Sequence, residues 1–556
     1  MRGKRTSALV RLLFLLPLFA AACAPTPTTP TPTVPAAQAD ETPKYGGRVA
    51  YTATAVTETL NPYKATSTGP RAVLGPIYES LLSLDYQLEG ETVKDYRVDY
   101  PVRPMLAESW QQTNDTTYVF TMRRGVKWHD GADLTAADVV FSYDYLRDIK
   151  NAFPLRGNVK DIDKVELVDP HTVRVSSKGP APALLMSLAD PNVMILPKHV
   201  NDRGDDFAKV AVGTGPFKYK AFDRTGSSLF VRNEGYWQAG RPYMDGVEVF
   251  YGMDQSARLA AFVSKKADLR GPPDKVQFET LVKQVPDAKY ATMITTYGDS
   301  LLMKLDAPPF EDLRVRRALH LAVDRQALLK AVGFDIGIVN PPGMPGVKTG
   351  WAVPQEDLLK LPGYRQPKEA DIAEAKRLLS EAGYPAGLKT VTLVNVARSF
   401  TPRIAEGMAG QLRQIGVDME IRVQPTAEWR KATQDGQFET YMDFVADAVP
   451  ANYQFTYLHS KGTLNKMPIN DPRLDELIDK QAVSLDVGEQ KRAALEMQRL
   501  LIEKLYVIPT IEVGAFQVWQ PWVRNYIYNI GTSEIVDQEN AASMWLDVEK
   551  MPADRR

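Results

Sequence analysis

The sequence of 556 residues is poor in the residues that build disulfides and hydrolytic or metal sites. Cys23 is its only cysteine, so no disulfide can form within the chain and stability must come from hydrophobic cores. Neither a Gly-x-Ser-x-Gly nor a His-Glu-x-x-His motif occurs, which disfavours a secreted hydrolase. With 67 basic and 68 acidic residues the net charge is −1, so there is no basic excess that would attract nucleic acid.

An apolar run near the amino terminus, Leu12 to Ala22, is shorter than the roughly twenty residues that cross a bilayer. Basic residues precede it and small residues end it, which predicts a secretory signal at residues 1–22. Ala20 to Ala22 and Cys23 resemble the lipobox of bacterial lipoproteins, with Ala20 where leucine is usual. We therefore expect a lipid on Cys23 that anchors an extracytoplasmic protein to the cell membrane, in the periplasm or at the cell surface. The alternative is that Cys23 merely ends a signal peptide.

Residues 23–43 are rich in proline and threonine, a composition that favours an extended tether and buries no core. The remaining body, of roughly 510 residues, exceeds what one hydrophobic core usually supports, so several packed units are expected. The whole chain has 44% apolar and 24% charged residues, which is typical of a globular protein. We expect a tethered body with more than one lobe.

Periodicity predicts an α/β fold in the body. Thr390 to Leu393 read as a strand, Ile404 to Ile415 have helical spacing and stop at Gly416, and Met419 to Val423 alternate as a second strand. A strand, helix and strand with short connections indicate a parallel pair joined by a right-handed crossover. Further helices are predicted over Asp312–Val332, Ala370–Ala382 and Glu489–Leu505.

Several ordered blocks occur between residues 46 and about 530. They include Pro104–Trp110, Tyr118–Gly131, Leu134–Val139, Tyr78–Leu82, Gly213–Phe217, Arg232–Trp237, Arg241–Asp245 and Asp312–Arg325. Together they resemble the family 5 extracellular solute-binding proteins of ABC transporters, a family that includes oligopeptide-, dipeptide- and nickel-binding receptors. His129 and Asp130 supply too few ligands for a metal, and Gly213–Phe217 lacks the lysine of a phosphate loop and predicts a tight turn. No cofactor or metal is expected.

The resemblance implies a two-lobe periplasmic-binding-protein clamshell of type II, with an extra subdomain in lobe I and two crossing strands as hinge. Lobe I would comprise residues 44–84, 213–298 and 509–556, its extra subdomain residues 85–212, and lobe II residues 299–508. We expect a monomer that encloses a small ligand between the lobes and presents it to ABC permease subunits.

Two residues of lobe II are predicted to read the ends of a peptide. Asp447, after Phe444 in the segment Asp443–Asn452, matches a family aspartate that receives the ligand ammonium, although Phe444 replaces a usual tryptophan and Pro450 comes one residue early. Arg398 matches an arginine of dipeptide-binding members that engages the ligand carboxylate with its planar fork. The alternatives are that Asp447 caps a turn and Arg398 is an ordinary loop residue.

Three further residues are candidates for the side-chain pocket. Trp429 matches an aromatic residue that lines this pocket in peptide-binding relatives, and it is equally compatible with a place in the core. Phe444 and Asn465 are candidates of the same kind.

Other ligands and roles remain open at this point. A nickel complex or a sugar would use the same fold, but a nickel site needs converging histidines or carboxylates, and only His459 lies close in sequence to the predicted pocket. A receptor that senses a peptide without importing it would have the same sequence features. The changes around residues 443–450 leave the choice of ligand open.

Overall fold

The computed structural model describes residues 42–53, 59–64, 73–85, 101–222, 226–272, 274–332, 336–344, 350–396, 400–444, 450–462, 464–528 and 537–556. Residues 37–556 form one compact unit, and the description below concerns that unit. The predicted signal segment and Cys23 lie outside the described residues. Within the described ranges, no helix has the length and apolar character required to cross a bilayer.

One mixed sheet forms the framework of the protein. Its eleven described strands are β1 (Arg48–Thr52), β8 (Phe217–Phe222), β9 (Ser227–Arg232), β10 (Gly246–Phe250), β11 (Leu269–Arg270), β12 (Lys289–Met303), β13 (Ile338–Val339), β14 (Leu388–Asn395), β15 (Val417–Gln424), β16 (Thr440–Phe444) and β17 (Val507–Trp519). The strand order is β15-β14-β16-β12-β17-β11-β1-β10-β9-β8, with β13 paired to β17. Strands β1, β10 and β11 are parallel, as are β14, β15 and β16. The sheet therefore has two parallel regions.

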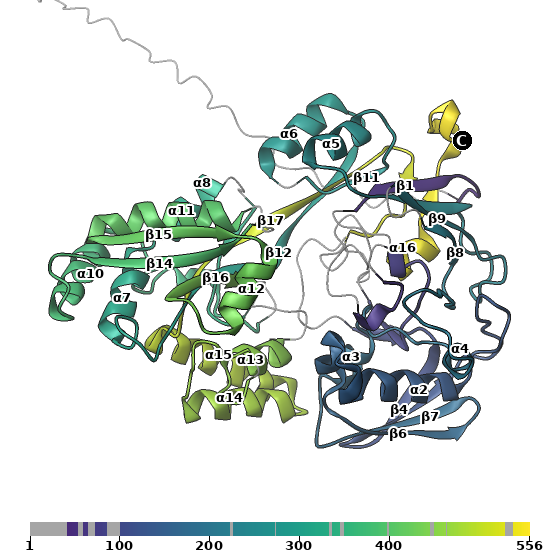
Figure 1. The fold of residues 1–556 in the computed structure, drawn as a ribbon, viewed down its shortest axis with the longest axis horizontal. Helices are drawn as coiled ribbons and strands as arrows, with labels where there is room; N and C mark the ends of the chain where they lie inside the picture. Colours follow the sequence, from purple (N-terminus) through teal and green to yellow (C-terminus); the bar gives the residue numbers. More distant parts are fainter. Residues whose placement is uncertain are drawn as a thin grey trace, which may run out of the picture. The chain divides into compact units, whose positions relative to one another are not determined.

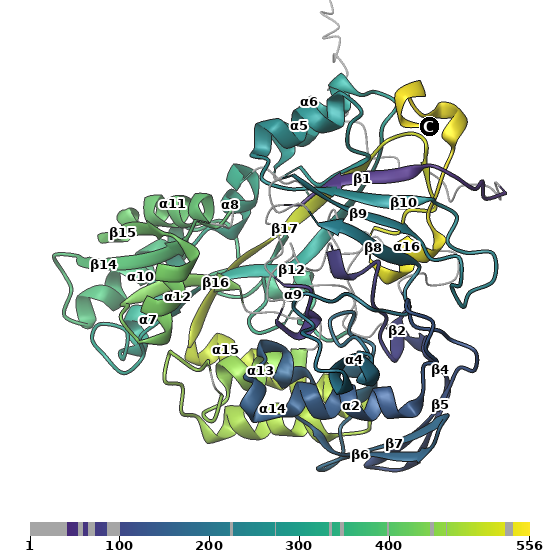
Figure 2. The ribbon, with the colours of Figure 1, turned by 45° about the vertical axis from the view of Figure 1, so that its right-hand side comes forward.

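The long strands β12 and β17 join these two regions. They pair antiparallel from Lys289 with Trp519 at one end to Leu302 with Val507 at the other, while β16 pairs with the second half of β12. The register shifts on both sides of Gly298, an irregularity of the kind that increases local twist. Both strands run from the β14–β16 region to the region of β1 and β8–β10 (Figures 1 and 2). These are the two crossing strands that the resemblance implies.

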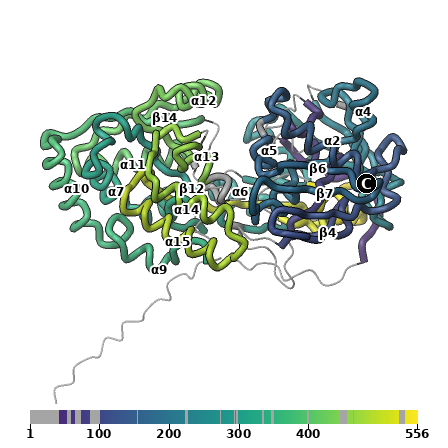
Figure 3. The backbone as a smooth tube through the Cα atoms, turned by 90° about the horizontal axis from the view of Figure 1, so that it is seen from below, coloured from purple at the N-terminus to yellow at the C-terminus, as the bar shows by residue number. Residues whose placement is uncertain are grey.

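We use the name lobe II for the part built around β14–β16 and lobe I for the part built around β1 and β8–β11. Lobe I combines distant segments, because β1 lies beside β10 and β11, and β11 pairs with the last residues of β17. In Figure 3, purple and yellow segments accordingly lie together in one half of the unit, whereas lobe II is green. The exact domain boundaries expected from the resemblance remain a prediction.

The strand, helix and strand predicted in lobe II are present. Strand β14 pairs in parallel with β15 over their full lengths, and α11 (Thr401–Leu412) connects them. A 3-10 turn at Arg413–Ile415 follows, and Gly416 then adopts φ +83°, which a glycine tolerates at a helix end. The predicted helices at 370–382 and 489–505 correspond to α10 (Glu369–Glu381) and α15 (Val487–Lys504).

The single helix predicted over Asp312–Val332 is wrong, because the structure has two helices there. They are α7 (Leu313–Ala322) and α8 (Arg325–Val332), separated by Val323 in an extended conformation. Asp324 begins the second helix by accepting a hydrogen bond from the Ala327 amide. The apolar spacing continues through the break, so periodicity alone did not reveal it.

Arg325 stabilises this break from a fully buried position. Its guanidinium donates to the carbonyls of Val323, Gly363 and Pro509, at 3.2, 2.7 and 2.8 Å, and lies 4.3 Å from the centre of the Tyr364 ring. These carbonyls belong to the helix break, to a loop and to strand β17. One side chain therefore fixes three separate segments of lobe II.

The other helices of lobe II are α9 (Gln355–Leu358), α12 (Thr426–Gln434), α13 (Pro450–Leu458) and α14 (Pro472–Val483). Those of lobe I are α2 (Ala136–Arg147), α3 (Leu184–Leu188), α4 (Lys198–Asp202), α5 (Gln255–Val263), α6 (Lys275–Gln284) and α16 (Gln538–Ser543). The short 3-10 helices are Pro62–Lys64, Ile149–Asn151, Pro154–Val159, Arg413–Ile415, Val548–Lys550 and Ala553–Arg555.

A separate four-stranded antiparallel sheet lies within the region expected to be the extra subdomain. Its order is β4-β5-β7-β6, from β4 (Ala107–Asn114), β5 (Thr117–Met122), β6 (Ile162–Asp169) and β7 (Thr172–Ser177). Helix α2 packs on β6 and β7. Two small sheets pair β2 (Leu82–Leu84) with β3 (Val102–Pro104), and β18 (Val523–Arg524) with β19 (Trp545–Leu546).

The glycine-rich segment Gly213–Phe217 packs against the backbone that precedes β2. A Cβ on Gly213 would lie 1.9 Å from the Ile77 carbonyl oxygen, and one on Gly215 would lie 2.6 Å from it. His129 holds the other side, since its Nε2 lies 2.9 Å from the Gly215 carbonyl and its Nδ1 accepts from the Gly213 amide. This is the close turn that the sequence predicted.

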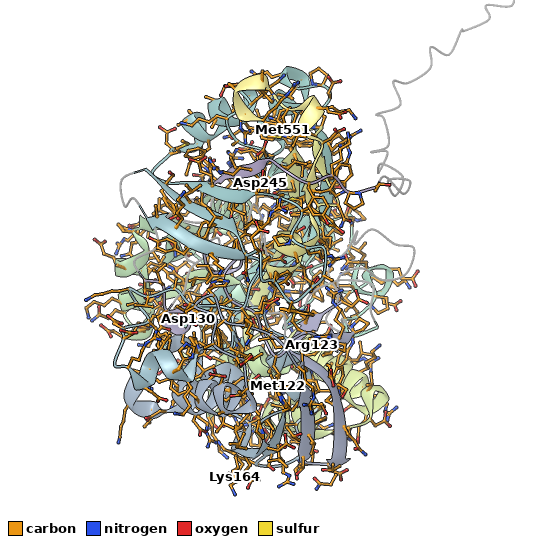
Figure 4. All side chains as sticks on the ribbon, turned by 90° about the vertical axis from the view of Figure 1, so that its right-hand side faces the viewer. Met122, Arg123, Asp130, Lys164, Asp245 and Met551 are labelled. Atoms are coloured by element: carbon orange, nitrogen blue, oxygen red, sulfur yellow. The ribbon has the colours of Figure 1, made fainter. Side chains whose placement is uncertain are left out.

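The neighbouring Asp130, labelled in Figure 4, contacts His199 Nε2 at 2.8 Å. Burial lowers the pKa of His129 to about 4, so this ring is neutral at physiological pH. His129 and Asp130 therefore connect separate segments of lobe I.

Glu79, beside the same turn, is a completely buried carboxylate. It accepts hydrogen bonds from Thr214 Oγ1 at 2.8 Å, from Tyr236 OH at 2.7 Å and from Trp237 Nε1 at 2.9 Å. Burial raises its pKa to about 7, against the opposite influence of these three donors, and the nearby Glu539 raises it further. Glu79 thus connects the first segment of lobe I to residues 214–237.

Candidate ligand-binding site

The candidate site begins where the parallel strands of lobe II end. The carboxyl ends of parallel strands lie at one edge of a sheet, and ligands of open α/β sheets bind there. Strands β14 and β16 are direct neighbours, with Thr392 opposite Thr440. Arg398 and Asp447 follow these two strands in sequence but lie in segments 397–399 and 445–449, outside the described residues.

Thr401, the first residue of α11, is tied to strand β12 by a buried hydrogen bond. Its hydroxyl donates to the Asp299 carboxylate at 2.8 Å. The main-chain oxygen of Asp299 in turn accepts from Thr510 Oγ1 at 2.5 Å. At the preceding Gly298 a Cβ would lie 2.3 Å from Asn340 Nδ2, so this position has no room for a side chain. The crossing strands and the start of α11 are therefore fixed to one another.

Three buried acidic residues lie at this junction: Asp299 on β12, Asp443 on β16 and Glu512 on β17. In the strand registers Asp299 is opposite Phe444, Ser300 is opposite Asp443, and Gly298 is opposite Glu512. Burial raises the pKa of Tyr441 well above its usual value, and the Asp443 carboxylate adds to that shift. Buried carboxylates need cationic or hydrogen-bonding partners, and the Asp299 carboxylate has one in Thr401 Oγ1.

The corresponding edge of lobe I has the opposite charge. Arg270 ends β11 and Arg258 lies in α5, and both are almost fully buried. Arg270 donates to Gln255 Oε1 at 2.6 Å, and Arg258 donates to Thr52 Oγ1 at the end of β1 at 3.0 Å. Burial lowers the pKa of Arg270 to about 9, with a further contribution from Arg258. The buried charged groups at the two strand edges therefore differ in sign.

Two of the remaining predicted pocket residues, Trp429 and Asn465, lie in well-packed surroundings. Trp429 on α12 is 7% exposed and packs edge-on against Tyr441, with ring centres 6.0 Å apart. Asn465 donates to the carbonyls of His459 and Ile469 and accepts from the Ile469 amide, so it closes its own loop. Phe444 ends β16, and its side chain lies outside the described residues. The structure does not bring Trp429 and Asn465 into a described contact.

Sequence reasoning missed Asp299 and Glu512. Glu512 is an acidic residue inside a strand that is otherwise largely apolar, and this signal could have identified it. Strand β12 is more polar, so Asp299 has no such signal. Within the described ranges, no group of three or more histidine, cysteine or acidic side chains is placed to hold a metal ion.

Residues 101–466 match the family model for "Bacterial extracellular solute-binding proteins, family 5 Middle". The chain belongs to this family. The resemblance seen in the sequence is thereby confirmed, and the protein is a solute-binding protein of the kind that serves ABC transporters. Members of the family are named for binding rather than for catalysis.

Among curated relatives, this family 5 protein is similar to the glutathione-binding protein GsiB of Salmonella choleraesuis strain SC-B67. The two are 32% identical over 365 residues, and the match covers 65% of this chain and 67% of GsiB. Among solved structures it is similar to the dipeptide-binding protein of Pseudoalteromonas sp. SM9913 in complex with Met-Leu. That match has a TM-score of 0.74 and 22% identity, and it covers 90% of this chain and 100% of the other.

A second solved structure of similar fold is NikZ from Campylobacter jejuni in complex with Ni(L-His). Its TM-score is 0.71 with 20% identity, and the match covers 87% of this chain and 96% of NikZ. These similarities confirm the type II clamshell fold of this family 5 protein. They also show that one fold holds ligands of different chemistry.

Proposed function

We propose that this protein captures short peptides between its lobes and delivers them to the permease of an ABC importer, while a lipid on Cys23 holds it at the outer face of the cell membrane. The observation that carries the peptide assignment is the adjacency of β14 and β16. The loops that follow these two strands contain Arg398 and Asp447, one residue for each charged end of a peptide. A peptide with free ends carries both charges.

Within this proposal, Asp447 receives the ligand ammonium and Arg398 engages the ligand carboxylate. Support comes from the neighbouring positions of β14 and β16, because the loops that contain these two residues begin at adjacent ends of one sheet. Thr401 and Asp299 fix the start of α11, directly after the first of these loops. Trp429, Phe444 and Asn465 shape the adjacent pocket for side chains.

The relatives support a peptide ligand. GsiB is named for glutathione, a tripeptide, and the protein from Pseudoalteromonas sp. SM9913 was solved with Met-Leu. Binding would favour a closed arrangement of the lobes, because a ligand held by both lobes stabilises the form in which they meet.

Thermal unfolding of the unlipidated protein tests the proposal. The protein starting after Cys23 is heated with Met-Leu, glutathione, nickel with histidine, or a sugar, each in large excess. A ligand at a hundred times its Kd stabilises the folded state by about 2.7 kcal/mol. We expect an increase with a peptide that is lost in Asp447→Ala and retained in the control Asp435→Ala, at the end of α12. An increase with nickel and histidine or with the sugar alone would refute the peptide assignment.

A further inference from the structure

Gln517 is a buried amide on crossing strand β17 whose hydrogen-bonding capacity is unused within the protein. The residue is 0% exposed, and neither Nε2 nor Oε1 has a hydrogen-bond partner among the described residues. An unpaired buried polar atom costs about 1–3 kcal/mol, so such a group in a native protein needs an explanation. Two unpaired atoms on one side chain make a purely structural role costly.

The position of Gln517 places it on the strand that passes between the lobes. It is opposite Ala291 on β12, in the segment where β17 also pairs with β11 of lobe I. Side chains alternate along a strand, so Gln517 shares a face with Ala515 and Trp519, and the opposite face presents Phe516 and Val518. Phe516 stacks on Phe278 of α6, with ring centres 4.4 Å apart, so α6 covers that opposite face.

The face that carries Gln517 is bordered by small and partly accessible residues. Ala291 and Ala515 are both partly exposed at the border of the hydrophobic core. Trp519, also partly exposed, packs edge-on against Tyr526 with ring centres 5.3 Å apart. The Tyr526 hydroxyl is itself buried and has no hydrogen-bond partner among the described residues. Two unpaired polar groups, the Gln517 amide and the Tyr526 hydroxyl, therefore lie on β17 and on a residue that packs against it.

We infer that Gln517 is a ligand-contacting residue that binds a peptide group of the solute. A carboxamide offers one acceptor, Oε1, and donors on Nε2, which is complementary to the N–H and C=O of one peptide bond. A metal ion would not use the donor, and a carboxylate would not use the acceptor. This inference rests on the proposed peptide function and adds to it a contact with the ligand backbone, independent of the peptide ends.

A buried glutamine of lobe II supplies the matched control. Gln498 on α15 is also 0% exposed, but its amide donates to the carbonyls of Trp351 and Ala494 and accepts from the Val353 amide. Gln498→Met removes satisfied hydrogen bonds and leaves partners unpaired, whereas Gln517→Met removes two unpaired atoms. The two variants should therefore differ in their effects on stability and on binding.

The experiment measures thermal midpoints without ligand and the Kd for Met-Leu and for glutathione by titration calorimetry. We expect Gln517→Met to keep or raise the midpoint and to weaken peptide binding about tenfold, as expected when two hydrogen bonds are lost. Gln498→Met should lower the midpoint and leave the Kd unchanged. An ester analogue of Met-Leu, which lacks the amide N–H, should bind less well than Met-Leu to the wild type, and this difference should shrink in Gln517→Met.

Three other results would overturn the role of Gln517 or the proposed function. If the wild type binds peptide and Gln517→Met binds it equally well, the inference is overturned and the proposed function stands. A fall in midpoint for Gln517→Met as large as that for Gln498→Met would also overturn it, because it would show that the amide has a structural role. If the wild type binds neither peptide, the proposed function fails and the role of Gln517 fails with it.

Discussion

Glu79 should make the stability of this protein depend on pH in an unusual direction. Its pKa is raised from 4.5 to about 7, so between these values the folded state binds a proton that the unfolded state has released. Stability from this group is therefore fully present below about pH 4.5 and is lost as the pH rises through about 7. At 1.36 kcal/mol per pKa unit, the loss is about 3 kcal/mol.

Urea unfolding of the wild type and of Glu79→Gln between pH 5 and pH 8 measures this effect. The substituted glutamine cannot ionise, so the variant should gain about 3 kcal/mol relative to the wild type as the pH rises, apart from a constant offset. In a protein of about 500 residues, a change of about 3 kcal/mol in the free energy of unfolding shifts the thermal unfolding midpoint by about 3 °C. Glu108→Gln, at an exposed position on β4, is the control and should show no comparable trend. A constant difference between Glu79→Gln and the wild type would refute the reasoning.

Other substitutions test the remaining structural claims. Arg325→Met should lower the free energy of unfolding by about 3 kcal/mol, because four buried carbonyls lose their donor. Arg377→Met, on the exposed face of α10, should change it little. Equal effects of the two variants in urea unfolding would contradict the role of Arg325. Gly213→Ala should impair folding, because its Cβ would meet the Ile77 carbonyl, whereas Gly410→Ala, with open space around it, should fold normally by circular dichroism. Cys23→Ser should move the protein from the membrane fraction to the soluble fraction, and an unchanged distribution would exclude a lipid anchor at that residue.

The sequence allowed the local architecture of lobe II to be predicted, because its signals act over short distances. Apolar spacing and Gly416 defined β14, α11 and β15. The break between α7 and α8 was missed because it depends on Arg325, which binds carbonyls from Gly363 and Pro509, residues far away in the chain. Periodicity has no information about such partners.

The candidate site was predicted only in part for the same reason. The resemblance predicts roles for Asp447 and Arg398 from local motifs, and both residues lie outside the described ranges. Asp299 and Glu512 lie more than 200 residues apart and come together only through the pairing of β12 with β17. The unpaired amide of Gln517 is likewise a property of packing, and no residue pattern around it distinguishes it from an ordinary polar residue in a strand.

The continuity of β12 and β17 through both lobes also constrains how the protein folds after synthesis. Strand β1 lies beside β11, and β11 pairs with residues 518 and 519 of β17, so the central sheet of lobe I needs chain from both ends. Pairings between distant residues form slowly, because closing a long loop costs entropy before any contact compensates for it. A nascent chain that lacks β17 therefore cannot complete the central sheet of either lobe.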